Sequence, residues 1–174
     1  NLTSVFETFK KIVPDGSDVD KLNLSLANTR ARLRMTTLYY FAGLHSLLVA
    51  GTGNKIEDFG VGFYTKYGDG GVDLSPIADL MKSEVHLLGS YLKIPESILK
   101  ASPTDGLFGD DRTDEDQLGA SYAELEWAML ENEAGKSSDD FSGRKKIVLD
   151  IYKRLNTINQ HKMTAIPVCF IPNE

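Results

Sequence analysis

The sequence predicts an α/β fold in which a parallel sheet is flanked by helices. One observation is a short apolar run at residues 47–50, followed by a glycine turn, which is typical of a buried strand. Another is the helical spacing of apolar residues in most of the remaining segments. A lone apolar strand needs neighbours on both edges. We therefore expect the helix-rich, later part of an α/β domain, whose other strands are missing or supplied by something else.

The composition is that of an ordinary globular domain and excludes some classes of protein. The 174 residues suit one domain, residues 1–174, which we expect to be truncated at its N-terminus because Asn1 leads almost directly into a helical pattern. The net charge of −6 argues against a general nucleic-acid binder. No run of about 18 apolar residues predicts a membrane span. The single cysteine, Cys169, excludes an internal disulfide, and a cytoplasmic location is expected.

Two helices are expected before residue 45. The first covers residues 2–9, where Ser4 and Glu7 can form a capping box, and Pro14 ends it. The second runs from about residue 24 to residue 43. We expect one of its faces to turn inward, the one formed by Leu26, Leu33, Thr37 and Tyr40.

The second helix carries more apolar side chains than a solitary surface helix needs. Those outside the inward face include Leu38, Tyr39, Phe41 and Leu44. One apolar stripe is enough for a helix on the surface of a monomer, so the surplus predicts contact with a second subunit. We therefore expect a two-fold homodimer.

Helical spacing resumes after the glycine-rich stretch. A helix is expected to start near Pro76, with Asp73 or Ser75 as its cap. A short helix follows at residues 95–101. Residues 105–117 are polar, acidic and rich in glycine, so we expect a solvated loop there.

Two more helices are expected in the last third of the chain. Ser121 and Glu124 form a capping box for a helix that runs to about residue 132. A polar linker is expected at residues 136–144. The last helix, at residues 143–163, is expected to turn inward the side chains of Ile147, Ile151, Leu155 and Ile158.

The stretch GTGNKIED directly follows the predicted strand. Ligands of an open α/β sheet bind beyond the carboxyl ends of its strands, so residues 52–57 are a candidate site. Thr52 offers a hydroxyl, and Glu57 or Asp58 suits Mg²⁺, which takes oxygen ligands. Asn54 and Glu57 also fit the cap and third position of a short helix, and the sequence leaves both interpretations open.

Five glycines lie between residues 60 and 71, in the stretch FGVGFYTKYGDGG. Such a cluster is typical of a surface loop with turns, and it also lets the main chain come close to a ligand. Lys66 can donate to a phosphate or carboxylate, while Asp69 and Asp73 can accept hydrogen bonds. The stretch is not a dinucleotide-binding GxGxxG motif, because no strand leads into it.

Taken in chain order, several stretches closely resemble NAD synthetase of the ammonia-dependent type. They are NTRARLRM, AGTGNKIED, FYTKYGDGGVDLSPIADLMK, ASPTDGLFGDDRTDEDQLGASYAELE and QHKMTAIP, which together reach from about residue 28 to residue 167. The resemblance implies an N-type ATP pyrophosphatase, with the parallel sheet and flanking helices of the adenine nucleotide alpha hydrolase-like fold and a homodimeric assembly. It also implies that ATP and ammonia amidate deamido-NAD, giving NAD, AMP and pyrophosphate through an adenylylated intermediate, with Mg²⁺ bound.

The resemblance also assigns functions to individual positions. It implies ATP contacts at Thr52, Lys82 and Thr104, and a Mg²⁺ ligand at Glu57, with Asp58 as the alternative. It implies contacts with deamido-NAD at Arg32, Lys66, Asp73, His161 and Lys162. It assigns no catalytic residue.

One element of the family pattern is not found in these residues. The pyrophosphate-binding loop SGGxDS follows the first strand of the family and does not occur in this sequence. We therefore expect residues 1–174 alone not to turn over. The alternatives are an inactive, truncated module for nucleotide binding or dimerisation, and another amide-forming ATP pyrophosphatase.

Overall fold

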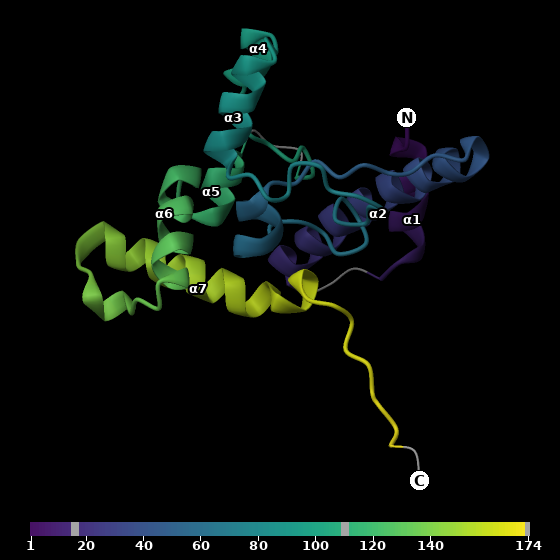
Figure 1. Ribbon diagram of the computed structural model, residues 1–174. Helices are drawn as coiled ribbons and strands as arrows, with labels where there is room; N and C mark the ends of the chain where they lie inside the picture. The colour runs from purple at the N-terminus through teal and green to yellow at the C-terminus, as the bar shows by residue number, and fades with distance from the viewer. Residues whose placement is uncertain (15–17, 109–111, 173–174) are drawn as a thin grey trace.

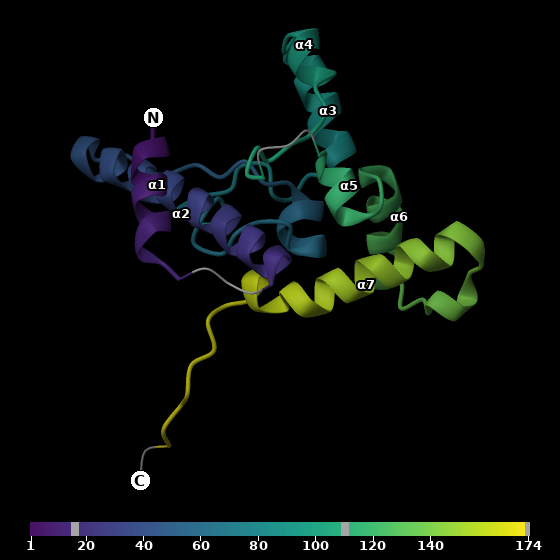
Figure 2. The same ribbon diagram turned by 180° about the vertical axis from the view of Figure 1, so that it is seen from behind.

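A computed structural model describes residues 1–14, 18–108 and 112–172 of the chain, and its described part is mainly helical (Figure 1). Helices α3 and α4 project from the body, and the C-terminal tail runs away from it, in both views (Figure 1, Figure 2). The helices are α1 (Thr3–Ile12), α2 (Val19–His45), the π-helix η1 (Ile56–Val61), α3 (Lys82–Tyr91), α4 (Glu96–Leu99), α5 (Asp114–Leu118), α6 (Tyr122–Glu133), the 3₁₀-helix η2 (Ser138–Asp140) and α7 (Gly143–Met163).

Strand pairing in the described residues is limited to one parallel bridge, between Ala50 and Leu74. Gly51 N donates to Leu74 O at 2.7 Å, and Asp73 N donates to Val49 O at 2.9 Å. Only Val49 of the predicted strand is buried, whereas Leu47 and Leu48 are 63% and 69% exposed. The predicted burial of the whole run is therefore wrong for the described part, where the run pairs with one neighbouring segment through a single bridge.

The core lies where α7 packs against α6 and η1. Its buried cluster includes Ile56, Leu125 and Leu149, each with no exposed surface. A fully buried side chain of this size contributes about 1.5–3 kcal/mol to the free energy of unfolding. The core therefore holds η1, with Glu57 and Asp58, rigidly against the two long C-terminal helices.

The buried face of α7 differs from the predicted one. Val148, Leu149 and Tyr152 are buried, while Ile147 and Ile158 are more than half exposed. The remaining predicted members, Ile151 and Leu155, are half-buried. The inward stripe is displaced because α6 and η1 contact α7 along one side of the predicted face.

Helix α2 starts five residues earlier than predicted, because Asp18 caps it by accepting from Lys21 N at 3.1 Å. Its fully buried residues are alanines, including Ala27 and Ala31. Three of the predicted inward side chains, Leu26, Leu33 and Thr37, are only half-buried. Tyr40, the fourth, is 65% exposed, so its prediction is wrong.

Close packing of the glycine-rich loop against α2 explains why a small residue, Ala31, lies at their contact. A Cβ atom on Gly68 would lie 2.9 Å from the Ala31 Cβ atom, and one on Gly70 would lie 2.3 Å from the Tyr64 ring. Real Cβ atoms do not approach neighbours so closely. At least two of the glycines are therefore required by packing within the protein itself.

Some predicted helix starts are wrong, and a side-chain hydrogen bond at the cap explains the start of α3. Helix α1 starts at Thr3, where Asn1 Oδ1 accepts from Thr3 N at 3.0 Å, and it has no Ser4–Glu7 capping box. Helix α3 starts at Lys82, because Glu84 accepts from Met81 N at 2.7 Å. Within the predicted loop 105–117, of which residues 109–111 lie outside the described part, α5 begins at Asp114.

The polar stretch 136–144 also differs from the prediction, since it contains the short helix η2. By contrast, the predicted capping box of α6 is present. Glu124 accepts from Ser121 N at 2.9 Å, and Ser121 Oγ accepts from Glu124 N at 3.3 Å.

Candidate active site

A cavity of about 220 Å³ lies where four distant segments of the chain meet. Thr52 follows the bridge at Ala50, Glu57 and Asp58 belong to η1, and Lys162 lies at the end of α7. Asp69, from the glycine-rich loop, completes the polar lining. The structure thus brings Thr52, Glu57 and Lys162 together, three of the positions that the resemblance singles out.

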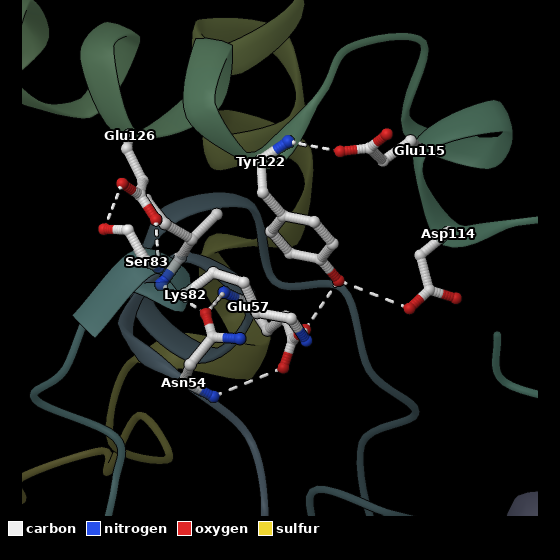
Figure 3. A network of polar contacts seen from close by, with 9 residues as sticks. Asn54, Glu57, Lys82, Ser83, Asp114, Glu115, Tyr122 and Glu126 are labelled. Atoms are coloured by element: carbon white, nitrogen blue, oxygen red, sulfur yellow. Dashed lines mark hydrogen bonds and ion pairs between the residues drawn. The ribbon is translucent and has the colours of Figure 1, made fainter. Parts of the chain in front are cut away.

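Glu57 is held by donors from three segments (Figure 3). Its Oε1 atom accepts from the Tyr122 hydroxyl at 2.6 Å and from Lys82 Nζ at 3.0 Å. Its Oε2 atom accepts from Asn54 N at 3.2 Å. The Glu57 side chain is only 15% exposed, so these contacts form in a largely buried setting.

Asn54 acts as a cap, and this is compatible with a ligand function for Glu57. The buried Asn54 Oδ1 atom accepts from Ile56 N at 3.0 Å and from Glu57 N at 3.1 Å. These bonds set the start of η1 and turn Glu57 toward Lys82 and Tyr122. The hydrogen bonds therefore support the cap interpretation of the GTGNKIED stretch, and the ligand function of Glu57 stays a prediction.

Negative charge is concentrated at this cavity. Burial, followed by the neighbouring charges of Glu57 and Asp69, raises the pKa of Asp58 to about 6. On the opposite side, burial lowers the pKa of Lys162. Lys162 Nζ donates to Gly62 O at 2.9 Å and to Tyr64 O at 2.8 Å, so its ammonium group is held against the loop.

The donor set at the cavity fits Mg²⁺. In the described residues, no three His, Cys, Asp or Glu side chains are arranged to enclose a metal ion. Mg²⁺ does not need such a cluster, because it commonly binds through one or two carboxylates together with substrate phosphates and water. A cation beside Glu57 and Asp58 would also offset the repulsion that raises the pKa of Asp58.

A second group of predicted residues meets on the outside of the glycine-rich loop. Arg32 Nε and Nη2 both donate to Lys66 O at 3.3 Å, and Lys66 Nζ donates to His161 O. The structure therefore joins Arg32, Lys66 and His161, which come from α2, the loop and α7. Each of the two cations is held against a backbone carbonyl oxygen, and Arg and Lys side chains are suited to an anionic ligand.

Asp73 and Thr104 have other surroundings. The Asp73 carboxylate accepts from Val49 N at 2.8 Å and from the Tyr39 hydroxyl at 3.1 Å, so it supports the bridge region. Thr104 is exposed, and the adjacent Pro103 lines a hollow of about 280 Å³ together with Lys82. The Lys82–Glu57 ion pair lies between this hollow and the cavity, since each partner lines one of them.

Sequence reasoning misses Tyr122 and Asp114, although both contact the site. The Tyr122 hydroxyl lies 3.3 Å from Asp114 Oδ2 as well as 2.6 Å from Glu57 (Figure 3). Tyr122 follows the Ser121 cap and is 65 residues from Glu57, so its sequence surroundings indicate only a helix start. A signal exists in the acidic run TDED before it, but that run also fits a solvated loop.

The sequence model of NAD synthase matches residues 1–165. The chain belongs to the NAD synthase family. It is 36% identical, over 98% of its length, to the NH(3)-dependent NAD(+) synthetase of Methanococcoides burtonii and 47% identical, over 78%, to that of Picrophilus torridus. The chain spans 65% and 51%, respectively, of the length of these two relatives.

Solved structures of NAD synthase relatives share the fold. The chain superposes on an NMN synthetase from Francisella tularensis with a TM-score of 0.76 at 30% identity, over 99% of this chain and 65% of that one. It superposes on an NH3-dependent NAD synthetase from Campylobacter jejuni with a TM-score of 0.71 at 25% identity, over 98% and 63%. The predicted fold class is therefore confirmed.

No described helix is long and apolar enough to cross a membrane.

Proposed function

We propose that this chain contributes the nucleotide-binding and dinucleotide-binding face of an ammonia-dependent NAD synthetase. The observation that carries the proposal is the coincidence of two findings. The NAD synthase match covers residues 1–165, and the cavity within that range gathers Thr52, Glu57 and Lys162. The reaction would convert deamido-NAD, ATP and ammonia to NAD, AMP and pyrophosphate.

The chemistry requires activation of a carboxylate, which is a poor electrophile toward ammonia. A carboxylate oxygen of deamido-NAD attacks the α-phosphorus of ATP, and pyrophosphate leaves. Ammonia then attacks the activated carbonyl carbon, loses a proton, and AMP leaves. The protein supplies orientation and shields the adenylylated intermediate from water.

The residues around the Lys82–Glu57 pair are assigned to ATP. Thr52, in the cavity, offers a hydroxyl, and Lys82, in the neighbouring hollow, offers an ammonium group to the phosphates. Thr104, which follows Pro103 of that hollow, is assigned to ATP by the family resemblance. Glu57 would hold Mg²⁺, with Asp58 as the alternative ligand. When bound, Mg²⁺ offsets the negative charge of the phosphates during displacement.

The residues around the loop are assigned to deamido-NAD. Lys66, Arg32 and His161 form one contiguous group, and Lys162 follows directly at the cavity. Asp73 is also assigned to deamido-NAD. Because Asp73 holds Val49 N as well, a variant of Asp73 would report on folding and binding together.

The nature of the acid substrate is open to a second proposal. The Francisella tularensis relative is described as an NMN synthetase, which favours a mononucleotide substrate. The relatives that are 36% and 47% identical are both described as NAD(+) synthetases, which favours the dinucleotide.

We also propose a homodimer in the cytoplasm. The alternatives of an inactive module and of another amide-forming ATP pyrophosphatase are tested by the same assay.

The test is NAD formation by the enzyme that contains this chain, with ATP, Mg²⁺ and ammonia, using deamido-NAD or nicotinate mononucleotide as the acid substrate. Lys66→Ala should weaken the binding of deamido-NAD by about 10- to 150-fold, since a charge-assisted hydrogen bond is worth roughly 1.5–3 kcal/mol. ATP affinity, measured by calorimetry, should stay unchanged. Lys11→Ala, an exposed lysine on α1, is the control. No amide product from either acid, or loss of ATP affinity alone in Lys66→Ala, would contradict the proposal.

A further inference from the structure

The Tyr122 hydroxyl lies between two carboxylates that come from different parts of the chain. It is 2.6 Å from Glu57 Oε1 in η1 and 3.3 Å from Asp114 Oδ2 at the start of α5. Tyr122 itself is the first residue of α6 and is only 6% exposed. Its hydroxyl is therefore held by hydrogen bonds to these two carboxylates (Figure 3).

A hydroxyl has one proton to donate, and the distances indicate where it goes. The 2.6 Å contact is the length of a charge-assisted O–H···O bond, whereas 3.3 Å is too long for a strong one. The proton therefore belongs to the Glu57 contact. Lys82 Nζ donates to the same Oε1 atom at 3.0 Å and lies 4.6 Å from the centre of the Tyr122 ring.

The two carboxylate oxygens of Glu57 are consequently not equivalent. Oε1 is taken up by Tyr122 and Lys82. Within the part of the chain that the structure describes, Oε2 accepts one bond, from Asn54 N at 3.2 Å, and keeps a lone pair for another partner. The Tyr122 bond, together with that from Lys82, thus leaves Oε2 as the oxygen of Glu57 that is available to a cation.

Asp114 extends this arrangement toward Thr104. Asp114 is 8% exposed, and its buried Oδ1 atom has no hydrogen-bond partner among residues 1–14, 18–108 and 112–172. Asp114 N donates to Pro103 O at 3.0 Å. A chain of contacts therefore runs from Pro103, which precedes Thr104, through Asp114 and Tyr122, to Glu57.

We propose that Tyr122 is a positioning residue of the nucleotide site, which orients Glu57 toward a divalent cation and ties it to the segment that carries Thr104. This inference rests on the proposed function, because it deepens the assignments of Glu57 and Thr104. Tyr122 does not contact the reacting atoms. It acts through the Glu57 carboxylate.

The test replaces Tyr122 by phenylalanine, which keeps the ring and the core packing and removes the hydroxyl. Mn²⁺ is used as the probe, and its binding with a non-hydrolysable ATP analogue is followed by electron paramagnetic resonance. Loss of a group that orients a metal ligand typically weakens metal affinity by about 10- to 100-fold. We expect a loss in this range for Tyr122→Phe, with a matching rise in the Mg²⁺ concentration needed for half-maximal rate.

Tyr152→Phe is the matched control, because Tyr152 is a buried tyrosine of the same core cluster on α7. It should leave Mn²⁺ affinity unchanged. Deamido-NAD affinity should be unchanged in Tyr122→Phe, because the residues assigned to it do not touch Tyr122. Unchanged Mn²⁺ affinity in Tyr122→Phe would overturn the inference. So would a parallel loss of Mn²⁺ and deamido-NAD binding, which would give Tyr122 a folding role alone.

Failure of the proposed function gives a different result. It would show as a wild-type enzyme that forms no NAD, whatever its Mn²⁺ affinity. The comparison between wild type and Tyr122→Phe is made on binding and does not depend on turnover.

Discussion

Glu124 connects the start of α6 to α7. Its carboxylate accepts from Arg144 Nε and Nη2, both at 2.7 Å, and also from Ser121 N at 2.9 Å. The hydrogen bonds from Arg144, followed by that from the Ser121 backbone, lower the pKa of Glu124 to about 2. The pair lies at the surface, so solvent screens much of its energy.

At the residue scale, the first prediction concerns Glu124→Gln. A carboxyl group with a lowered pKa in the folded state stabilises the fold above its unfolded pKa of 4.5 and loses that contribution as pH falls toward about 2. We expect Glu124→Gln to lower the free energy of unfolding at pH 7 by about 1 kcal/mol. Urea titrations between pH 7 and pH 3 should show this difference shrinking. An equal difference at both ends of the range would mean that charge is not its cause.

Two of the three arginines of α2 act on one segment. Arg30 Nη1 donates to Leu107 O, and its guanidinium lies 4.2 Å from the centre of the Phe6 ring. Arg34 lies one turn further and approaches the carbonyl groups of Asp105 and Gly106 at 3.5 Å. The face of α2 that carries Arg30 and Arg34 thus holds residues 105–107, whereas Arg32 contacts the glycine-rich loop.

At the element scale, Arg30→Ala should release the backbone of residues 105–107. It removes one hydrogen bond from a charged donor and one cation–π contact, together about 1–3 kcal/mol of local stability. Amide exchange of Leu107 should therefore become about 5- to 150-fold faster, as measured by mass spectrometry. Arg154→Ala, an exposed arginine on α7, serves as the control. An unchanged exchange rate at Leu107 in Arg30→Ala would show that α2 does not hold this segment.

Local chemistry determines how well each element can be predicted. The start of α6 depends on Ser121 and Glu124, which are three residues apart, and it is predicted correctly. The inward face of α7 depends on where α6 and η1 lie, which its own spacing does not contain. The start of α3 depends on competition between Pro76 and the Glu84 cap, and the cap determines it.

The same reasoning applies to the candidate site. Thr52 and Glu57 share one short stretch with a strand end, so sequence alone indicates a site there. Tyr122 joins them only through the packing of α6 against η1, and Asp114 through its contact with Tyr122. The individual ligand contacts that the sequence assigns stay predictions.

At the scale of the whole molecule, α2 presents large apolar side chains to solvent. Leu38, Phe41 and Leu44 are 55%, 51% and 61% exposed, and Phe41 stacks on His45. Contiguous apolar surface of this kind is typical of an interface between subunits. The proposed homodimer would place this part of α2 at the two-fold axis.

Phe41→Asp should weaken the dimer of the enzyme that contains this chain. A charge at the centre of an apolar interface costs several kcal/mol when it is left unpaired. Light scattering should show monomers for Phe41→Asp at concentrations where the wild type is dimeric. Tyr91→Asp, which changes an 82% exposed aromatic residue on α3, is the control. A wild type that stays monomeric at high concentration would argue against the dimer, and an undisturbed dimer in Phe41→Asp would argue against α2 as its interface.

The uneven distribution of the core has a consequence for the order in which the chain unfolds. The largest buried cluster spans η1 and the helices from α5 to α7, whereas α1 and α2 bury only Phe6 and three alanines. Small buried side chains contribute little to stability, so opening of α1 and α2 requires less free energy than global unfolding. As denaturant is raised, α1 and α2 should therefore melt as an early cooperative unit. The core of η1 and α5 to α7, with Glu57 held in it, should persist as a partly folded species.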